Sequence, residues 1–138
     1  VFFKCIKAYT TNPEFIFGNI STEKFINFMN EQSGKDLDWF FDEWLFKPNH
    51  PVYQNNSRIE KSHNGTWKID YTINQIQKNT GFYKMPVELK VTFQNGKDST
   101  IDVSNDYNLQ TFSFDFISEP KKITFDPENK IILKEIKN

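Results

Sequence analysis

The chain has 138 residues, enough for one domain of ordinary size or two very small ones. Its 17 basic and 18 acidic residues give a net charge of −1, which argues against a nucleic-acid-binding protein, because such proteins present a basic face to phosphates. The single cysteine, Cys5, excludes an internal disulfide and fits a reducing or an oxidising compartment equally. No apolar run approaches the roughly 20 residues that cross a bilayer. The unusual feature is the aromatic content, with 15 Phe, 5 Tyr and 3 Trp.

The first residues predict a helix over 2–9. Lys4 and Lys7 share one side of that helix, and apolar side chains cover most of the rest. The polar run from Thr10 to Pro13 ends it, and a loop follows over 14–20. The chain begins without an initiator Met and directly in this apolar pattern, so we expect it to be part of a longer protein.

A second helix is expected from Ser21 to about Ser33. Ser21 is a good N-cap, Glu23 lies in the first turn where the helix dipole favours a carboxylate, and Gly34 can end the helix in a left-handed conformation. Its apolar residues form one stripe: Phe25, Ile26, Phe28 and Met29.

A third helix is expected over 37–46, with Asp36 as its cap and Pro48 as its end. It has two apolar faces rather than one. The first face comprises Leu37, Phe40, Phe41 and Trp44, extended by Leu45, and the nearly opposite face carries Trp39 and Phe46, flanked by Asp42 and Glu43. We therefore expect this helix to be packed on both sides, with one side supplied by sequence outside this chain.

After residue 50 the apolar residues alternate, as in strands with one buried face. Asn64-Gly65 and Asn95-Gly96 are typical of hairpin turns in which both central residues have positive φ, and 126–129 forms another turn. Pro86 indicates an edge strand, or a backbone position that faces away from a neighbouring strand. The prediction is an α+β fold: two to three helices over 1–50, then an immunoglobulin-like antiparallel β-sandwich over 51–138 of about seven strands. The expected strands are 52–61, 66–77, 84–94, 99–103, 109–117, 121–126 and 131–136.

No complete active site can be assembled from these residues. His50 and His63 belong to no zinc-binding motif, and Cys5 is expected in the core rather than as a nucleophile. We interpret Asp36 as a helix cap, and Asp38, Asp42 and Glu43 as the solvated side of a helix. No catalytic or metal-ligating residue is predicted in the chain, and it is not expected to be an enzyme on its own.

A second interpretation is a binding module for carbohydrate or protein. Aromatic side chains exposed on a β-sandwich can bind sugars, and Trp67, Tyr71 and the ladder Phe112, Phe114 and Phe116 are the candidates. Alternating aromatic residues in strands are more often core residues, so this stays the alternative.

Residues 20–51, ISTEKFINFMNEQSGKDLDWFFDEWLFKPNHP, resemble the zinc aminopeptidases of the aminopeptidase N type, the gluzincin family that includes the leukotriene hydrolase. The family's first closing helix is matched from Phe25 to Ser33-Gly34. The pattern D-L-x-x-F-F-x-x-W-L of its next helix is matched from Asp36-Leu37 to Trp44-Leu45, with Pro51 after it. The segments 67–77, 85–91 and 125–133 resemble strands of the β-sandwich that follows in the family.

The resemblance implies that the chain is the end of a catalytic domain plus a β-sandwich, without chemistry of its own. The family's zinc ligands and substrate-amine site lie upstream, so zinc, peptide substrate and peptide hydrolysis would belong to the parent protein, and this chain would hold no cofactor. Its partner would be the upstream catalytic domain of the same polypeptide, with no nucleic acid and no membrane span, and export of the parent is left open. The expected interface residues are Phe2, Phe3, Phe15, Trp39 and Phe46. The expected core residues are Phe25, Met29, Leu37, Phe40, Phe41, Trp44, Trp67 and Phe114.

Overall fold

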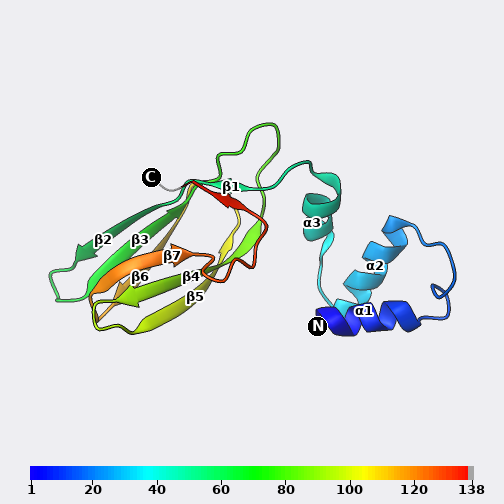
Figure 1. The fold of residues 1–138 in the computed structure, drawn as a ribbon, viewed down its shortest axis with the longest axis horizontal. Helices are drawn as coiled ribbons and strands as arrows, with labels where there is room; N and C mark the ends of the chain where they lie inside the picture. Colours follow the sequence, from blue (N-terminus) through cyan, green and yellow to red (C-terminus); the bar gives the residue numbers. More distant parts are fainter. Residues whose placement is uncertain (137–138) are drawn as a thin grey trace. The chain divides into compact units, whose positions relative to one another are not determined.

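The computed structural model describes residues 1–136, which form two compact units. The first unit, Val1–Lys47, is helical, and the second begins at Pro48 and consists of strands (Figure 1). The α+β fold expected from the sequence is therefore confirmed. Among the described residues, no helix combines the length and apolar character needed to cross a membrane.

The helical unit contains α1 (Phe2–Thr11), α2 (Thr22–Ser33) and α3 (Asp38–Phe41), and α3 continues into a π-helical turn, Asp42–Phe46. The ends predicted for α2 are confirmed. The Ser21 hydroxyl accepts the Lys24 N–H at 3.3 Å, and Gly34 ends the helix with φ of 65°.

The third helix differs from its prediction, because only its first turn is α-helical. From Asp42 the hydrogen bonds join residues five apart, and the Lys47 N–H donates to the Asp42 carbonyl at 3.1 Å. The Asp36 carboxylate accepts the Asp38 N–H at 3.0 Å, but Leu37 occupies the N-cap position. The wider turn changes which side chains share a face, so the stripe drawn from α-helical spacing does not hold beyond Phe41.

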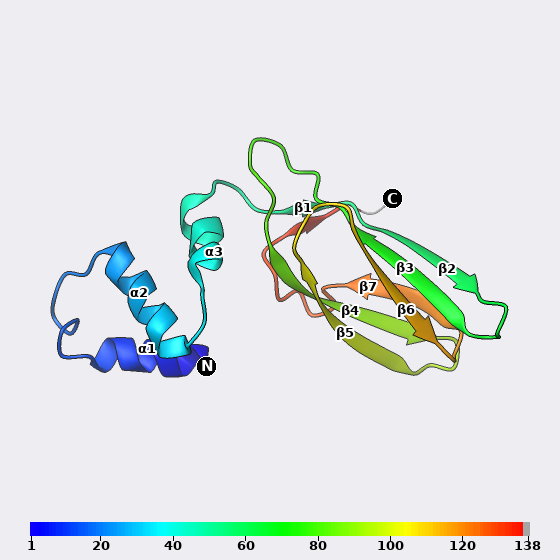
Figure 2. The same ribbon diagram turned by 180° about the vertical axis from the view of Figure 1, so that it is seen from behind.

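The second unit is a β-sandwich of two three-stranded antiparallel sheets (Figures 1 and 2). One sheet has the order β2-β3-β6, and the other has the order β5-β4-β7. The bounds are β2 Asn56–Lys61, β3 Trp67–Ile73, β4 Met85–Phe93, β5 Asp98–Asn105, β6 Gln110–Phe116 and β7 Pro120–Phe125. A further pair, β1 (Val52–Tyr53) and β8 (Lys134–Glu135), is parallel, so the described part of the chain has eight strands where about seven antiparallel ones were expected.

The single strand expected over 52–61 is two strands, because its antiparallel ladder with the β3 segment is interrupted at Asn55. The Asn55 side-chain oxygen accepts the Asn74 N–H at 3.2 Å, where a backbone carbonyl would otherwise stand. Before this point β1 pairs with β8, and Tyr53 also forms an antiparallel bridge with Gln75 after the end of β3. After this point β2 pairs with β3.

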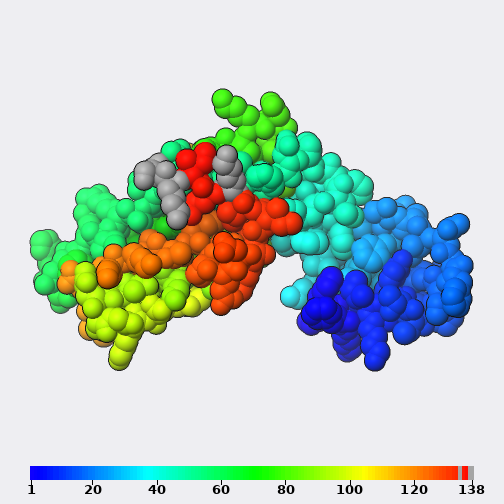
Figure 3. Space-filling view, viewed as in Figure 1, coloured from blue at the N-terminus to red at the C-terminus, as the bar shows by residue number. Residues whose placement is uncertain are grey.

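The core of the sandwich lies between the two sheets. It is built from the inward positions of β3 and β4, where alternation places Ile, Tyr, Leu, Val and Met side chains on one face. Aromatic contacts cross from one sheet to the other: Tyr71 stacks on Phe125 with ring centres 6.5 Å apart, and Phe93 meets Phe116 edge to face at 5.1 Å. The segment after β7, red-orange in Figure 3, lies on the surface of this unit.

Pro86 lies in β4, the central strand of its sheet, so the edge-strand interpretation is wrong. The second interpretation, in which the backbone position of Pro86 faces away from a paired strand, fits the structure. The Glu88 carbonyl accepts the Asp126 N–H at 2.9 Å, so Glu88 and Pro86, two residues apart, face the side of β7. Pairing with β7 begins only at Leu89, and the missing N–H of Pro86 costs no ladder hydrogen bond.

The two Asn-Gly turns exist, but their type differs from the expectation. Only the glycines have positive φ, 86° at Gly65 and 79° at Gly96. Each glycine N–H donates to the carbonyl three residues earlier, which makes a type I turn followed by a glycine bulge. Asparagine is favoured here because its side-chain oxygen accepts the N–H two residues later, as seen at Asn64 and Asn95.

A buried amide, the side chain of Gln75, joins the loops at one end of the sandwich. Its Oε1 accepts the Tyr83 N–H at 2.9 Å, and its Nε2 donates to the Tyr83 carbonyl at 2.7 Å, so the side chain pairs with Tyr83 as a neighbouring strand would. The same Nε2 donates to Asn105 Oδ1 at 3.0 Å. The Asn108 side chain pairs in the same way with the backbone of Gln75, at 2.7 and 2.9 Å. These contacts satisfy backbone groups where the ladders end.

We expect Gln75→Leu to lower the free energy of unfolding by about 2–4 kcal/mol, because it leaves the buried Tyr83 N–H and carbonyl and the Asn105 oxygen without this partner. Gln94→Leu, at an exposed position, should change stability by less than about 0.5 kcal/mol. Urea unfolding of both variants measures the difference. Equal midpoints for the two variants would show that the Gln75 network contributes no stability.

Candidate interface of the helical unit

The helical unit has a small core. Cys5 of α1, Met29 of α2 and Phe41 of α3 are buried together, and five partly buried apolar residues pack against them: Ile6, Phe25, Ile26, Phe28 and Leu37. Aromatic edge-to-face contacts hold the helices to one another. The Phe25 and Phe41 rings are 5.7 Å apart, and the Tyr9 and Phe25 rings are 5.1 Å apart.

One side chain of α2 fixes the start of α3. The Asn30 Oδ1 accepts the Leu37 N–H at 2.8 Å, and its Nδ2 donates to the Asp38 carboxylate at 2.7 Å. This satisfies a backbone donor at the helix start, where no intrahelical partner exists. The orientation of α3 against α2 thus depends on polar contacts as well as on the apolar core.

Large apolar side chains remain on the surface of this unit. Phe2 is 62% exposed, Phe3 83% and Phe46 64%, and these were three of the five residues expected at an interface. The other two, Phe15 and Trp39, are half-buried, and Phe15 packs on Phe28 with ring centres 5.1 Å apart. Sequence reasoning missed further exposed apolar residues, among them Ile16, Phe17 and Leu45. Surface aromatics at this density are typical of an interface with another protein surface.

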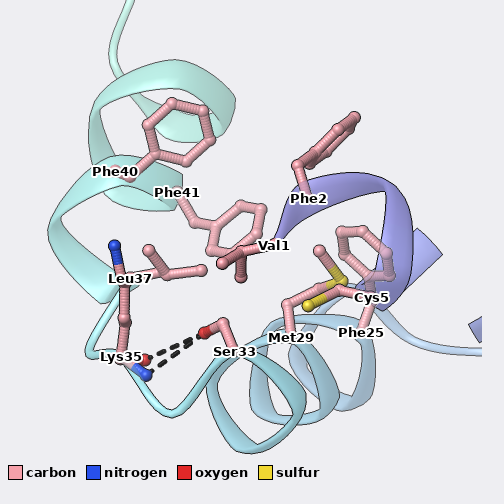
Figure 4. A pocket seen from close by; sticks show the side chains of 10 residues that line it. All are labelled: Val1, Phe2, Cys5, Phe25, Met29, Ser33, Lys35, Leu37, Phe40 and Phe41. Carbon is pink, nitrogen blue, oxygen red and sulfur yellow. Dashed lines mark hydrogen bonds between the residues drawn. The ribbon is translucent and has the colours of Figure 1, made fainter. Parts of the chain in front are cut away.

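An apolar cavity of about 280 Å³ lies among the three helices (Figure 4). Cys5, Met29 and Phe41 are among the residues that line it, and Phe2 and Phe40 line it as well. The polar part of the lining is small and consists of Ser33 and Lys35, which hydrogen-bond to each other, with the Lys35 N–H donating to Ser33 Oγ at 3.2 Å. The cavity is therefore suited to an apolar side chain rather than to a polar ligand.

The eight residues expected in the core differ in their burial. Met29 and Phe41 are buried, whereas Phe40 is 41% exposed. The remaining five are half-buried: Phe25, Leu37, Trp44, Trp67 and Phe114. Phe40 lies within α3 and lines the cavity between the helices, so part of its ring stays in contact with water.

Glu43 was interpreted as part of the solvated side of its helix, and this is wrong. The π-helical turn places Glu43 at 5% exposure, with its carboxylate 3.5 Å from the Lys47 ammonium. A buried carboxylate needs such a partner, because an isolated charge is costly to remove from water. Asp36, Asp38 and Asp42 are exposed as expected.

The residues considered for metal or nucleophilic chemistry belong to different units and have different surroundings. Cys5 is buried in the helical core, His63 is exposed at a hairpin turn, and the His50 Nδ1 is 3.0 Å from the carbonyl of Pro51. Within residues 1–136, no group of three or more His, Cys, Asp or Glu side chains is placed to hold a metal ion.

The sandwich has an open groove of about 490 Å³ between β2 and β7, which Tyr71 and Phe125 line together with Asn55, Lys122 and Glu135. Burial raises the pKa of the Tyr71 hydroxyl, and the nearby negative charge of Glu135 raises it further, so Tyr71 stays neutral. Of the sugar-binding candidates, Tyr71 is buried and the Phe112–Phe116 ladder is half-buried. Trp67 is also half-buried, with the Lys61 ammonium 5.6 Å from its ring centre.

Comparison with known proteins gives a match in structure but none in sequence. No protein-family model and no curated protein matches the chain. The crystal structure of Legionella pneumophila aminopeptidase A in complex with aspartic acid matches with a TM-score of 0.69 over 98% of this chain. The chain is similar in fold to a segment of that aminopeptidase. The two are 14% identical, and the match spans 15% of the aminopeptidase chain.

We expect Phe41→Ala to unfold the helical unit, because loss of a buried Phe costs about 3–5 kcal/mol and a unit this small has little stability to lose. Phe40→Ala is the matched control, since the neighbouring ring is exposed, and it should leave the helices intact. Far-ultraviolet circular dichroism at the helix band measures both variants. Equal loss of helix signal in the two would contradict the assigned core.

Proposed function

We propose that this chain is a non-catalytic scaffold segment of a zinc-dependent aminopeptidase, whose complete chain removes N-terminal amino acids from peptides. The observation that carries the proposal is the fold match to an aminopeptidase over 98% of this chain, combined with the ordered motifs between Phe25 and Pro51. In this proposal the zinc ion and the peptide substrate bind to the parent's catalytic domain, and this chain binds neither.

The surface of the helical unit supports the proposed role. Phe2, Phe3 and Phe46 are exposed, and an apolar cavity lies between the helices. Surfaces of this kind are costly to leave in water and are buried where a domain packs on another. The catalytic domain of the same polypeptide is the partner that the proposal assigns to these side chains.

The alternative function, a carbohydrate- or protein-binding sandwich, has less support. A sugar stacks on an exposed aromatic face, whereas Tyr71 is buried and Phe116 packs on Phe93 between the sheets. Trp67 is half-buried, and Trp67→Ala would abolish retention on a glycan array if this interpretation were correct.

The test compares this chain with the same reading frame extended upstream. Zinc content and hydrolysis of amino-acid p-nitroanilides are measured for both proteins. We expect only the extended protein to bind zinc and cleave the substrates. Absence of both properties from the extended protein would overturn the assignment to an active aminopeptidase.

A pair of variants tests the docking surface separately from catalysis. Phe3→Ser should leave the unfolding of the isolated chain almost unchanged, because the side chain is exposed there, but should lower the melting temperature of the extended protein. Ile117→Ser, at an exposed position of the sandwich, should have little effect in either protein. Equal behaviour of Phe3→Ser in both proteins would contradict docking through α1.

A further inference from the structure

Two hairpin turns of the sandwich have the same backbone hydrogen bonds. The turn between β2 and β3 contains Asn64-Gly65, and the turn between β4 and β5 contains Asn95-Gly96. In both, the glycine N–H donates to the carbonyl three residues earlier at 3.0 Å. In both, the asparagine Oδ1 accepts the N–H two residues later, at 3.1 Å from Thr66 and 3.0 Å from Lys97.

The two turns differ at the residue that follows the glycine. The Thr66 hydroxyl donates a second hydrogen bond to Asn64 Oδ1, at 2.7 Å. Lys97 holds the same place in the other turn and has no hydroxyl, and the Asn95 side-chain nitrogen instead donates to Ser118 Oγ at 3.4 Å. Among residues 1–136, the Asn64 oxygen is therefore held by two donors from one residue, and the Asn95 oxygen by a single backbone donor.

We propose that Asn64 is a site of self-modification, at which Gly65 attacks the asparagine side chain to form a succinimide, and that the Thr66 hydroxyl promotes the reaction. The Gly65 nitrogen gives its proton to a solvent base and bonds to Asn64 Cγ, while the electron pair of the C=O bond moves to Oδ1. The intermediate collapses, the bond from Cγ to Nδ2 breaks, and ammonia leaves with a proton from water. Water then opens the ring at either carbonyl, which gives aspartate or isoaspartate.

The role of Thr66 follows from where charge develops. Oδ1 becomes negative as Gly65 attacks, and donors aimed at such an oxygen stabilise the transition state more than the ground state. Both Thr66 donors already contact this oxygen before the reaction, the backbone N–H at 3.1 Å and the hydroxyl at 2.7 Å. Because the turn is exposed to water, one added hydrogen bond of ordinary net strength should accelerate the reaction by about threefold to tenfold.

The modification would change both charge and geometry of the turn. Conversion of Asn64 makes the net charge more negative than its present −1. Isoaspartate also adds one carbon to the main chain, which disturbs the pairing of Lys61 with Trp67 at the end of the β2–β3 ladder.

The experiment is incubation of the folded chain in mildly alkaline buffer at physiological temperature, followed by peptide mapping with mass spectrometry. We expect Asn64 to be converted several-fold faster than Asn95. Thr66→Val should remove this advantage, and Thr66→Ser, which keeps the hydroxyl, should retain it. Lys97→Thr should raise the rate at Asn95, which tests the proposal without altering the Asn64 turn.

Unfolding the chain in guanidinium provides the control for local sequence. The advantage of Asn64 over Asn95 should disappear there, because the Thr66 hydroxyl is no longer held on Oδ1. Equal or slower conversion of Asn64 in the folded chain, or an unchanged rate in both Thr66→Val and Lys97→Thr, would overturn the proposal.

Discussion

The helical unit carries more aromatic surface than 47 residues can bury. Its core contains only Cys5, Met29 and Phe41 as fully buried apolar residues, while Phe2, Phe3 and Phe46 remain in contact with water. Small units bury a smaller fraction of their surface than large ones and are correspondingly less stable. This shortage of burial explains both the cavity between the helices and the exposed aromatic side chains. It is also the observation on which the proposed docking to a larger partner surface rests.

The β-sandwich forms a larger apolar core from its own residues. Its two sheets bury the alternating side chains of β3 and β4, and paired aromatic rings bridge the sheets. Where the ladders stop, side-chain amides replace backbone partners, most clearly at Gln75 and Asn108. The two units therefore differ in the size of their cores: the sandwich buries whole rows of apolar side chains between its sheets, whereas the helical unit buries few.

Much of this arrangement could be predicted from the sequence because it depends on local chemistry. Ser21 and Gly34 mark the ends of α2, and period-two alternation identifies β3, β4 and β6.

The incorrect predictions arose where contacts between residues distant in the sequence determine the structure. No local signal shows that the turn after Phe41 is π-helical, and so Glu43 was placed in solvent. The break at Asn55 depends on Asn74, nineteen residues away. The buried network at Gln75 could have been found from the sequence, because Gln75 continues the inward-facing series Ile69, Tyr71, Ile73. A polar side chain at such a position needs buried hydrogen-bond partners.

Hydrogen exchange of the isolated chain, followed by mass spectrometry, tests the central claim most directly. The claim is that the helical unit lacks a sufficient core of its own, while the sandwich has one. The account predicts that amides of α1 and α2 exchange much faster than those of β3 and β4, because local stability follows the number of buried apolar contacts. Equal protection of the helices and the central strands would contradict it and show that the helical unit is complete without a partner.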